Sequence, residues 1–173
     1  MASTDPSAGF PPIESSSARI LILGSLPGQA SIDVQQYYAH PRNAFWTIMR
    51  GLTGADGDYD ERCRHLASSG IAVWDVLQQS VRPGSLDSSI RVDTARPNDF
   101  AQFFDRHRAL RVIGFNGRKA QDLFNRLVDT ELPRRAATAL LPSTSPAHAS
   151  MTAEAKLEVW RGILSPYLEG GMP

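Results

Sequence analysis

The chain has 173 residues, with 18 basic and 18 acidic side chains and a formal charge of zero. This length suits one domain with a sizeable core, and the zero charge argues against a protein that holds nucleic acid by global charge alone. The single cysteine, Cys63, excludes intrachain disulfides, iron–sulfur clusters and cysteine-rich zinc sites.

The first 17 residues are rich in serine, proline and alanine, and they lack the basic and apolar regions of a secretory signal. We expect residues 1–17 to form a mobile tail and residues 18–170 to form a single domain. No apolar run approaches the roughly 18 residues that a membrane span requires. We therefore expect a cytoplasmic protein without a membrane partner.

Four short runs predict strands, and the first two are typical of buried strands, because their apolar residues are continuous rather than alternating. They lie at residues 19–23, 71–75, 110–115 and 136–141. Apolar residues at helical spacing predict helices that begin near residues 45, 58 and 98, after residue 117, and near Thr152, a plausible N-cap.

This order of elements predicts an α/β fold, a three-layer α/β/α sandwich with a central four-stranded, mostly parallel sheet. In such folds a ligand binds beyond the carboxyl ends of the strands. The unusual stretches of the sequence all follow predicted strands and fall at that edge: residues 24–43, 74–89, 115–117 and 142–148. Their convergence predicts one shared site.

The stretch GSLPG at residues 24–28 follows the first strand. It lacks the Gly-Lys-Ser/Thr ending of a Walker loop and is not a dinucleotide fingerprint. Its glycines and proline fit either a tight turn or a close approach of the backbone to a phosphate or base. Asn43, just before the Phe45 helix, is either an N-cap or a polar group of the site.

Other candidates also have two interpretations. Phe45 packs in the core or faces a flat ligand, as do the neighbouring tyrosines 37 and 38. Residues 143–145 form a plain turn or donate hydrogen bonds to a phosphate. Asp75 at the end of the second strand is a turn cap or a carboxylate facing the ligand, and His148 is a surface histidine or a substrate contact.

Taken together, the motifs resemble the uracil-DNA glycosylase superfamily, and most closely its hypoxanthine-DNA (deoxyinosine) glycosylase branch. The resemblance rests on six segments that span most of residues 19–164: GSLPG at 24–28, QQYYAHPRNAFW at 35–46, GIAVWDVLQ at 70–78, GSLDSSI at 84–90, VIGFNG at 112–117 and LPSTSPA at 141–147. The second and third are long enough to be specific, whereas GSLPG and STSP are individually weak.

The resemblance implies a monofunctional enzyme of base excision repair that needs no metal and no cofactor. Such an enzyme flips a deaminated base (hypoxanthine, uracil or xanthine) out of double-stranded or single-stranded DNA, hydrolyses its N-glycosidic bond and leaves an abasic site. We expect it to act as a monomer.

The resemblance also implies roles for individual residues. The first motif, residues 24–28, lines the base and sugar site, Phe45 stacks on the flipped base, and Asp75 and Asn116 contact the base edge. The second motif, residues 141–147, presses on the DNA. The implied base-binding residues are Gly24, Ser25, Leu26, Pro27, Gly28, Phe45, Asp75 and Asn116, and the implied DNA-binding residues are Arg42, Ser143, Thr144, Ser145, Pro146 and His148.

The sequence departs from the broader superfamily at two positions. Leu26 replaces the Asp or Asn that usually positions the attacking water, and Leu141 replaces a frequent His. The hypoxanthine branch shares the first departure and places catalysis on Asn43, whose amide carbonyl can orient a water. The departures also motivate an alternative, a non-catalytic binder of damaged DNA or nucleotide. A weaker third candidate is a hydrolase of free nucleosides.

A neutral chain that binds DNA needs a local basic face. Basic residues in or near the loops at the predicted edge are candidates for it: Arg42, Arg82, Arg118, Lys119, Arg134 and Arg135.

Overall fold

The computed structural model describes residues 4–168. Residues 1–3 of the expected tail and residues 169–170 of the expected domain therefore lie outside the described residues.

The centre of the protein is a four-stranded sheet in the order β3-β2-β6-β7, and every neighbouring pair is parallel. The strands are β2 (Ile20–Gly24), β3 (Ile71–Asp75), β6 (Val112–Asn116) and β7 (Ala137–Leu141). Strands β2, β3 and β6 are buried along their whole length, whereas β7 at one edge of the sheet is largely exposed.

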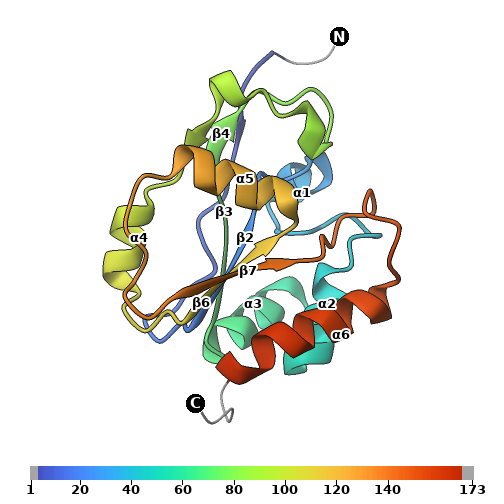
Figure 1. Ribbon diagram of the computed structural model, residues 1–173. Coiled ribbons are helices and arrows are strands. Elements are labelled where there is room, and N and C mark those ends of the chain that lie inside the picture. Colours follow the sequence, from blue (N-terminus) through green and yellow to red (C-terminus); the bar gives the residue numbers. More distant parts are fainter. Residues whose placement is uncertain (1–3, 169–173) are drawn as a thin grey trace.

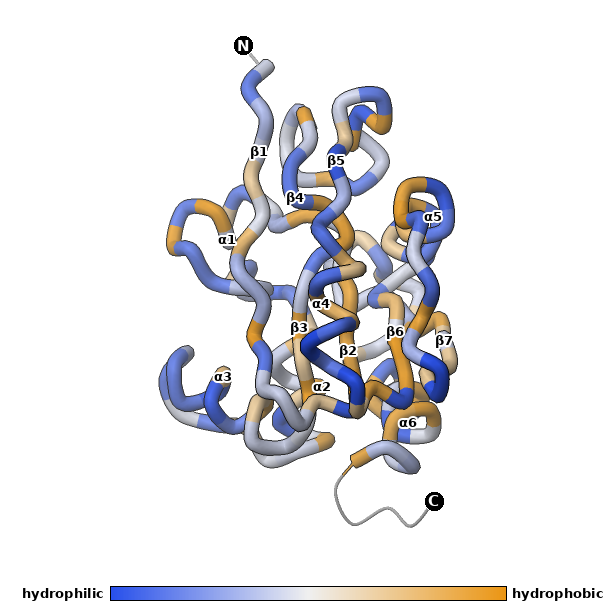
Figure 2. Tube along the Cα trace, turned by 90° about the vertical axis from the view of Figure 1, so that its left-hand side faces the viewer, coloured by the Kyte–Doolittle hydropathy of each residue, from blue (hydrophilic) through white to orange (hydrophobic). Residues whose placement is uncertain are grey.

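Successive side chains of β2 enter different cores. Leu21 and Leu23 pack with the side chains of α4 (Phe100–Arg106) and α5 (Arg118–Leu127), whereas Ile20 and Ile22 pack with those of α2 (Phe45–Thr53), α3 (Tyr59–Ser68) and α6 (Ala153–Leu164). Figure 1 shows the sheet between these two helical layers, and in Figure 2 strands β2 and β6 are hydrophobic at the centre of the molecule. The predicted three-layer α/β fold is confirmed.

Side-chain caps start three of these helices. Asp58 forms a capping box with Glu61 before α3, Asp99 accepts a hydrogen bond from the Gln102 amide before α4, and Thr152 accepts one from the Ala155 amide before α6. A short 3₁₀ turn, Ser165–Tyr167, follows α6. Between residues 4 and 168, no helix has the length and apolar character needed to cross a membrane.

The two long predicted loops contain short elements that the sequence analysis did not anticipate. Helix α1 (Gln29–Val34) lies in the first. The second contains β4 (Leu77–Ser80), the 3₁₀ turns Asp87–Ser89 and Val92–Thr94, and β5 (Arg96–Pro97). Strand β4 pairs with β5 and with β1 (Ser7–Ala8) in a small antiparallel sheet. Elements of two to six residues are too short to show a periodicity.

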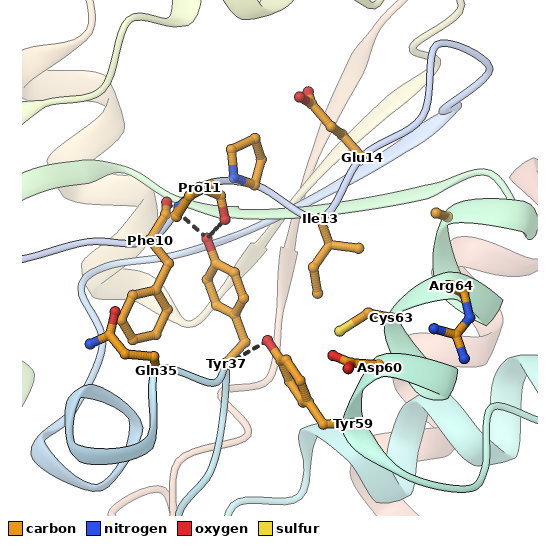
Figure 3. A pocket seen from close by; sticks show the side chains of 12 residues that line it. Phe10, Pro11, Ile13, Glu14, Gln35, Tyr37, Tyr59, Asp60, Cys63 and Arg64 are labelled. Carbon is orange, nitrogen blue, oxygen red and sulfur yellow. Dashed lines mark hydrogen bonds between the residues drawn. The ribbon is translucent and has the colours of Figure 1, made fainter.

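The N-terminal segment differs from the expected mobile tail, because its residues 7–14 pack along the domain. Ile13 forms an antiparallel bridge with Val73 at the edge of the central sheet, and Phe10 is buried. Figure 3 shows the Tyr37 hydroxyl donating to the carbonyl oxygens of Phe10 and Pro11. Isolated apolar residues in a Pro- and Ser-rich segment give no periodic signal, so composition alone could not predict this docking.

A surface depression of about 370 Å³ lies between this segment and α3 (Figure 3). Its lining includes Tyr37, Tyr59 and Cys63, and burial raises the pKa of the Cys63 thiol. A thiol with a raised pKa is a poor nucleophile.

Candidate active site

The carboxyl ends of the strands bring the predicted site residues together. The chain adds β3 on one side of β2 and then β6 on the other, so the strand order reverses at β2, which is where ligands bind in open α/β sheets. Gly24 ends β2 in register with Asp75, and Asn116 ends β6 in register with Leu141. Gly24 and Asp75 therefore lie side by side at the switch point.

Gly24 has a steric reason to be glycine. A Cβ atom at this position would lie 2.5 Å from Oδ1 of Asp75 and 2.8 Å from the hydroxyl oxygen of Tyr38. Both distances are shorter than real contacts of a Cβ atom, so only a hydrogen at this position lets the two polar groups approach the backbone.

Asp75 is a buried carboxyl group, with 3% of the residue exposed. Its Oδ2 atom has no hydrogen-bond partner in the described structure. Burial, and next the charge of Asp87, raise its pKa from 3.8 to about 7, while Arg82 acts in the opposite direction. Buried polar atoms are nearly always paired, so an unpaired carboxyl oxygen at a ligand-binding edge indicates that a ligand supplies the partner.

Tyr38 covers Phe45. Their rings stack with centroids 4.0 Å apart and planes 22° apart, Phe45 is fully buried, and Tyr38 is partly exposed. The backbone of Tyr38 has a φ of +54°, an uncommon conformation for a non-glycine residue. Its hydroxyl is buried near Asp75 and the Asn116 side chain, and no contact to it has the geometry of a full hydrogen bond in the described structure.

This arrangement differs from the role expected of Phe45. The Phe45 ring is fully buried and one of its faces is covered by the partly exposed Tyr38, so the expected stack of a base on Phe45 stays a prediction. In the sequence Tyr38 is only one of two neighbouring tyrosines, because the left-handed backbone that turns its ring onto Phe45 leaves no sequence signal.

The N-cap of α2 is Ala44 and not Asn43, which lies one residue earlier, but the Asn43 Oδ1 atom accepts a hydrogen bond of 3.0 Å from the amide of Phe45, the first residue of α2. One bond leaves the second lone pair of this oxygen available to a water. The next residue, Ala44, donates its amide to the carbonyl of Thr144 and ties this loop to the second motif.

The second motif is held by Asn116. The Asn116 amide donates to Oγ1 of Thr144 at 2.9 Å, and the Thr144 amide donates to Oδ1 of Asn116 at the same distance. Thr144 is only 1% exposed, so its side chain is not presented to DNA as expected, and Asn116 has a supporting role. Gly117, with a φ of +94°, packs directly on Ser143.

The other predicted residues divide by exposure. Ser25, Leu26 and Pro27 are buried, and Gly28 is half-buried. The predicted DNA contacts are at the surface: Arg42 is exposed, while Ser143, Ser145, Pro146 and His148 are half-buried. Of the basic candidates, Arg118, Arg134 and Arg135 are exposed, whereas Arg82 is buried and cannot belong to a basic face.

The parallel sheet, with unpaired polar groups at its switch point, has the architecture of α/β proteins whose ligand site lies at the carboxyl ends of the strands. Residues 11–164 match the family model of the uracil DNA glycosylase superfamily, and the chain belongs to that superfamily.

Individual relatives agree with this membership. Hypoxanthine DNA glycosylases of Methanosarcina barkeri (strain Fusaro) and Methanosarcina acetivorans (strain C2A) are 38% and 41% identical over 115 residues, which are 65% of this chain and 72% of theirs. A solution NMR structure of a candidate uracil DNA glycosylase from Methanosarcina acetivorans superposes with a TM-score of 0.74 and 34% identity, over 92% of this chain and 96% of that one.

Proposed function

We propose that this superfamily member is a DNA glycosylase that hydrolyses the N-glycosidic bond of hypoxanthine in DNA and leaves an abasic site. The observation that carries the proposal is the unpaired buried Oδ2 of Asp75, beside the unpaired hydroxyl of Tyr38. A flipped base brings its own donors and acceptors to a site, which explains why groups there remain unpaired without it.

Asp75 suits the edge of hypoxanthine in its neutral form. That edge presents the O6 carbonyl beside the N1–H donor, and a protonated carboxyl group can donate to O6 while it accepts from N1–H. An ionised carboxylate would repel O6. The base also gains negative charge as it departs, so a neutral carboxyl group stabilises this charge and a carboxylate opposes it. A pKa of about 7 keeps the neutral form available near neutral pH.

Bond cleavage then needs only a positioned water. The bond between C1′ and the base nitrogen breaks, its electron pair leaves with the base, and the sugar becomes an oxocarbenium ion. A water held by the carbonyl of Asn43 adds to C1′ and releases a proton. An amide is not a base near neutral pH, so Asn43 orients the water rather than deprotonating it.

The test uses a labelled oligonucleotide with one deoxyinosine, as a duplex and as a single strand, together with matched deoxyuridine and deoxyxanthosine substrates. Release of free hypoxanthine and an alkali-labile strand is the expected result. Binding of the deoxyinosine duplex without release of any of the three bases would instead identify a non-catalytic binder. The proposal also includes a monomeric and cytoplasmic enzyme. The mass of the purified protein in solution tests the monomeric state.

We expect Tyr38 to stack on the flipped base, with Phe45 as its support. Tyr38→Ala is expected to lower the single-turnover rate roughly 10- to 50-fold, because stacking of a base on an aromatic ring contributes about 1–3 kcal/mol. Tyr38→Phe keeps the ring and removes only the hydroxyl that the base would pair, so it should lose less activity than Tyr38→Ala. Equal rates for Tyr38→Ala and the unmodified protein would contradict this role.

A further inference from the structure

The loop of residues 82–90, which contains the GSLDSSI segment, is bonded to the first motif. Ser25 donates its hydroxyl to Oδ1 of Asp87 at 2.6 Å, and the Gln29 amide donates to Oγ of Ser85 at 3.0 Å. Arg82 donates to the carbonyl oxygens of Leu26, at 3.2 Å, and Pro27. Arg82 thus fixes the backbone of the first motif, and Asp87 fixes the Ser25 side chain.

Arg82 is an unusual side chain for this place. It is 5% exposed, and among the described residues no carboxylate lies within ion-pair distance of it. Its guanidinium also donates to the carbonyl oxygen of Gly84 at 3.2 Å. A buried cation costs several kcal/mol of desolvation, and an apolar side chain of similar size would fill the same space at lower cost. Stability alone therefore does not explain a cation here.

The geometry indicates what the guanidinium does. Its planar fork bonds two successive carbonyl oxygens, an arrangement that the single ammonium of lysine does not reproduce. The peptide bond between Pro27 and Gly28 is planar and trans, so fixing the Pro27 carbonyl also fixes the Gly28 N–H, which points the opposite way. Arg82 thereby sets the orientation of one backbone donor of the first motif, the Gly28 N–H.

Asp87, which lies on this loop, also acts on the charge of the site through Asp75. The charges of Asp87 and Arg82 both act on Asp75, in opposite directions. Tyr37 and Tyr38 are the other titratable side chains whose interaction with Asp75 is resolved, and Lys119 of α5 acts on Asp87. Residues on a separate loop therefore influence both the shape and the charge of the base site.

We propose that Arg82 and Asp87 are positioning residues of the glycosylase reaction, which hold the first motif in its active geometry and balance the charge around Asp75. Neither residue is needed to contact the DNA. This inference rests on the proposed function, because its main readout is excision of hypoxanthine.

The experiment measures single-turnover excision from a deoxyinosine duplex between pH 5 and 9 for Arg82→Met, Arg82→Lys and Asp87→Asn. Arg91→Met and Asp93→Asn are matched controls, since both residues are exposed and lie on the same long connection. Arg82→Met is expected to lower the maximal rate roughly 10- to 50-fold, with little change in the protein concentration that gives half-maximal rate. Arg82→Lys should not restore the rate, and the controls should match the unmodified protein.

The dependence of the excision rate on pH distinguishes a positioning role of Arg82 and Asp87 from a role in folding alone. Asp87→Asn removes a negative charge near Asp75, so the midpoint of the profile should move to lower pH by about half a unit to one unit. Arg82→Met removes a positive charge and should move it to higher pH. The carboxyl ¹³C resonance of Asp75, followed by NMR in the free protein, should titrate with the same two shifts and does not depend on activity.

Folded variants with the rate and the Asp75 titration of the unmodified protein would overturn the inference. If Arg82→Met fails to fold, Asp87→Asn, which is nearly isosteric, carries the test alone. An unmodified protein that releases no hypoxanthine would refute the proposed function instead, and the NMR titration would still decide whether Asp87 acts on Asp75.

Discussion

Replacing Asn43 by alanine is expected to lower the rate of hypoxanthine excision by about 10²–10³-fold and to leave the protein folded. The expectation follows from the proposed chemistry, in which the amide carbonyl of Asn43 is the group that orients the attacking water. Single-turnover excision from a deoxyinosine duplex measures the rate, and urea denaturation measures the stability.

The same oxygen also accepts a hydrogen bond from the Phe45 amide at the start of α2, so a control must separate the two roles. Loss of a side-chain hydrogen bond to a free amide at a helix start costs about 1 kcal/mol, and a serine hydroxyl can accept such a bond as asparagine does. Asn43→Ser should therefore recover most of the stability that Asn43→Ala loses, while its activity stays low because the shorter hydroxyl lies farther from the water. If Asn43→Ser regains both stability and activity, Asn43 serves only the start of α2 and the catalytic group lies elsewhere.

The fold was predictable because its signals are local. Continuous apolar runs identified β2, β3 and β6, and apolar spacing, with Thr152 as a predicted cap, identified the helices that cover the sheet. The parallel order of the strands then placed residues 24–28, 75 and 116 at one edge. These features depend on periods of a few residues, which a single sequence contains.

The details of the site depend on contacts between distant segments, and these leave no periodic signal. The stacking of Tyr38 on Phe45 requires a positive φ, and the bonds from Arg82 to the first motif join residues more than fifty positions apart. From sequence, Arg82 was one basic residue among several candidates for a DNA face. Only its burial against backbone carbonyls reveals a different role.

The Asp75 side chain is expected to increase the activity of the protein but to lower its free energy of unfolding at high pH. Asp75→Leu removes every polar contact to the base edge and should lower excision about 10²-fold, because a site built for hydrogen bonds loses them all. Asp75→Asn keeps one donor and one acceptor, so it should remain active. The activity of the unmodified protein should fall as the pH rises through about 7, where the carboxyl group ionises, and the profile of Asp75→Asn should be flat in this range.

Stability gives an independent measure of the same group. The folded pKa of about 7 lies above the ordinary value of 3.8, so between these values the unfolded chain has released a proton that the folded protein retains. The free energy of unfolding therefore falls as the pH rises across this window, and the full penalty is present above pH 7. Asp75→Asn removes it and should be more stable than the unmodified protein by about 2–4 kcal/mol at pH 8, with little difference at pH 4.

Urea denaturation of both proteins at pH 4, 6 and 8 tests the stability, and excision measured over the same range tests the activity. Because each comparison is made against the unmodified protein, the titration of other groups cancels. Activity that rises through pH 7, together with a stability difference independent of pH, would mean that the ionised carboxylate is the active form and that burial does not hold the proton. An unpaired buried carboxyl group therefore implies a base site that lowers the stability of the folded protein until a base binds.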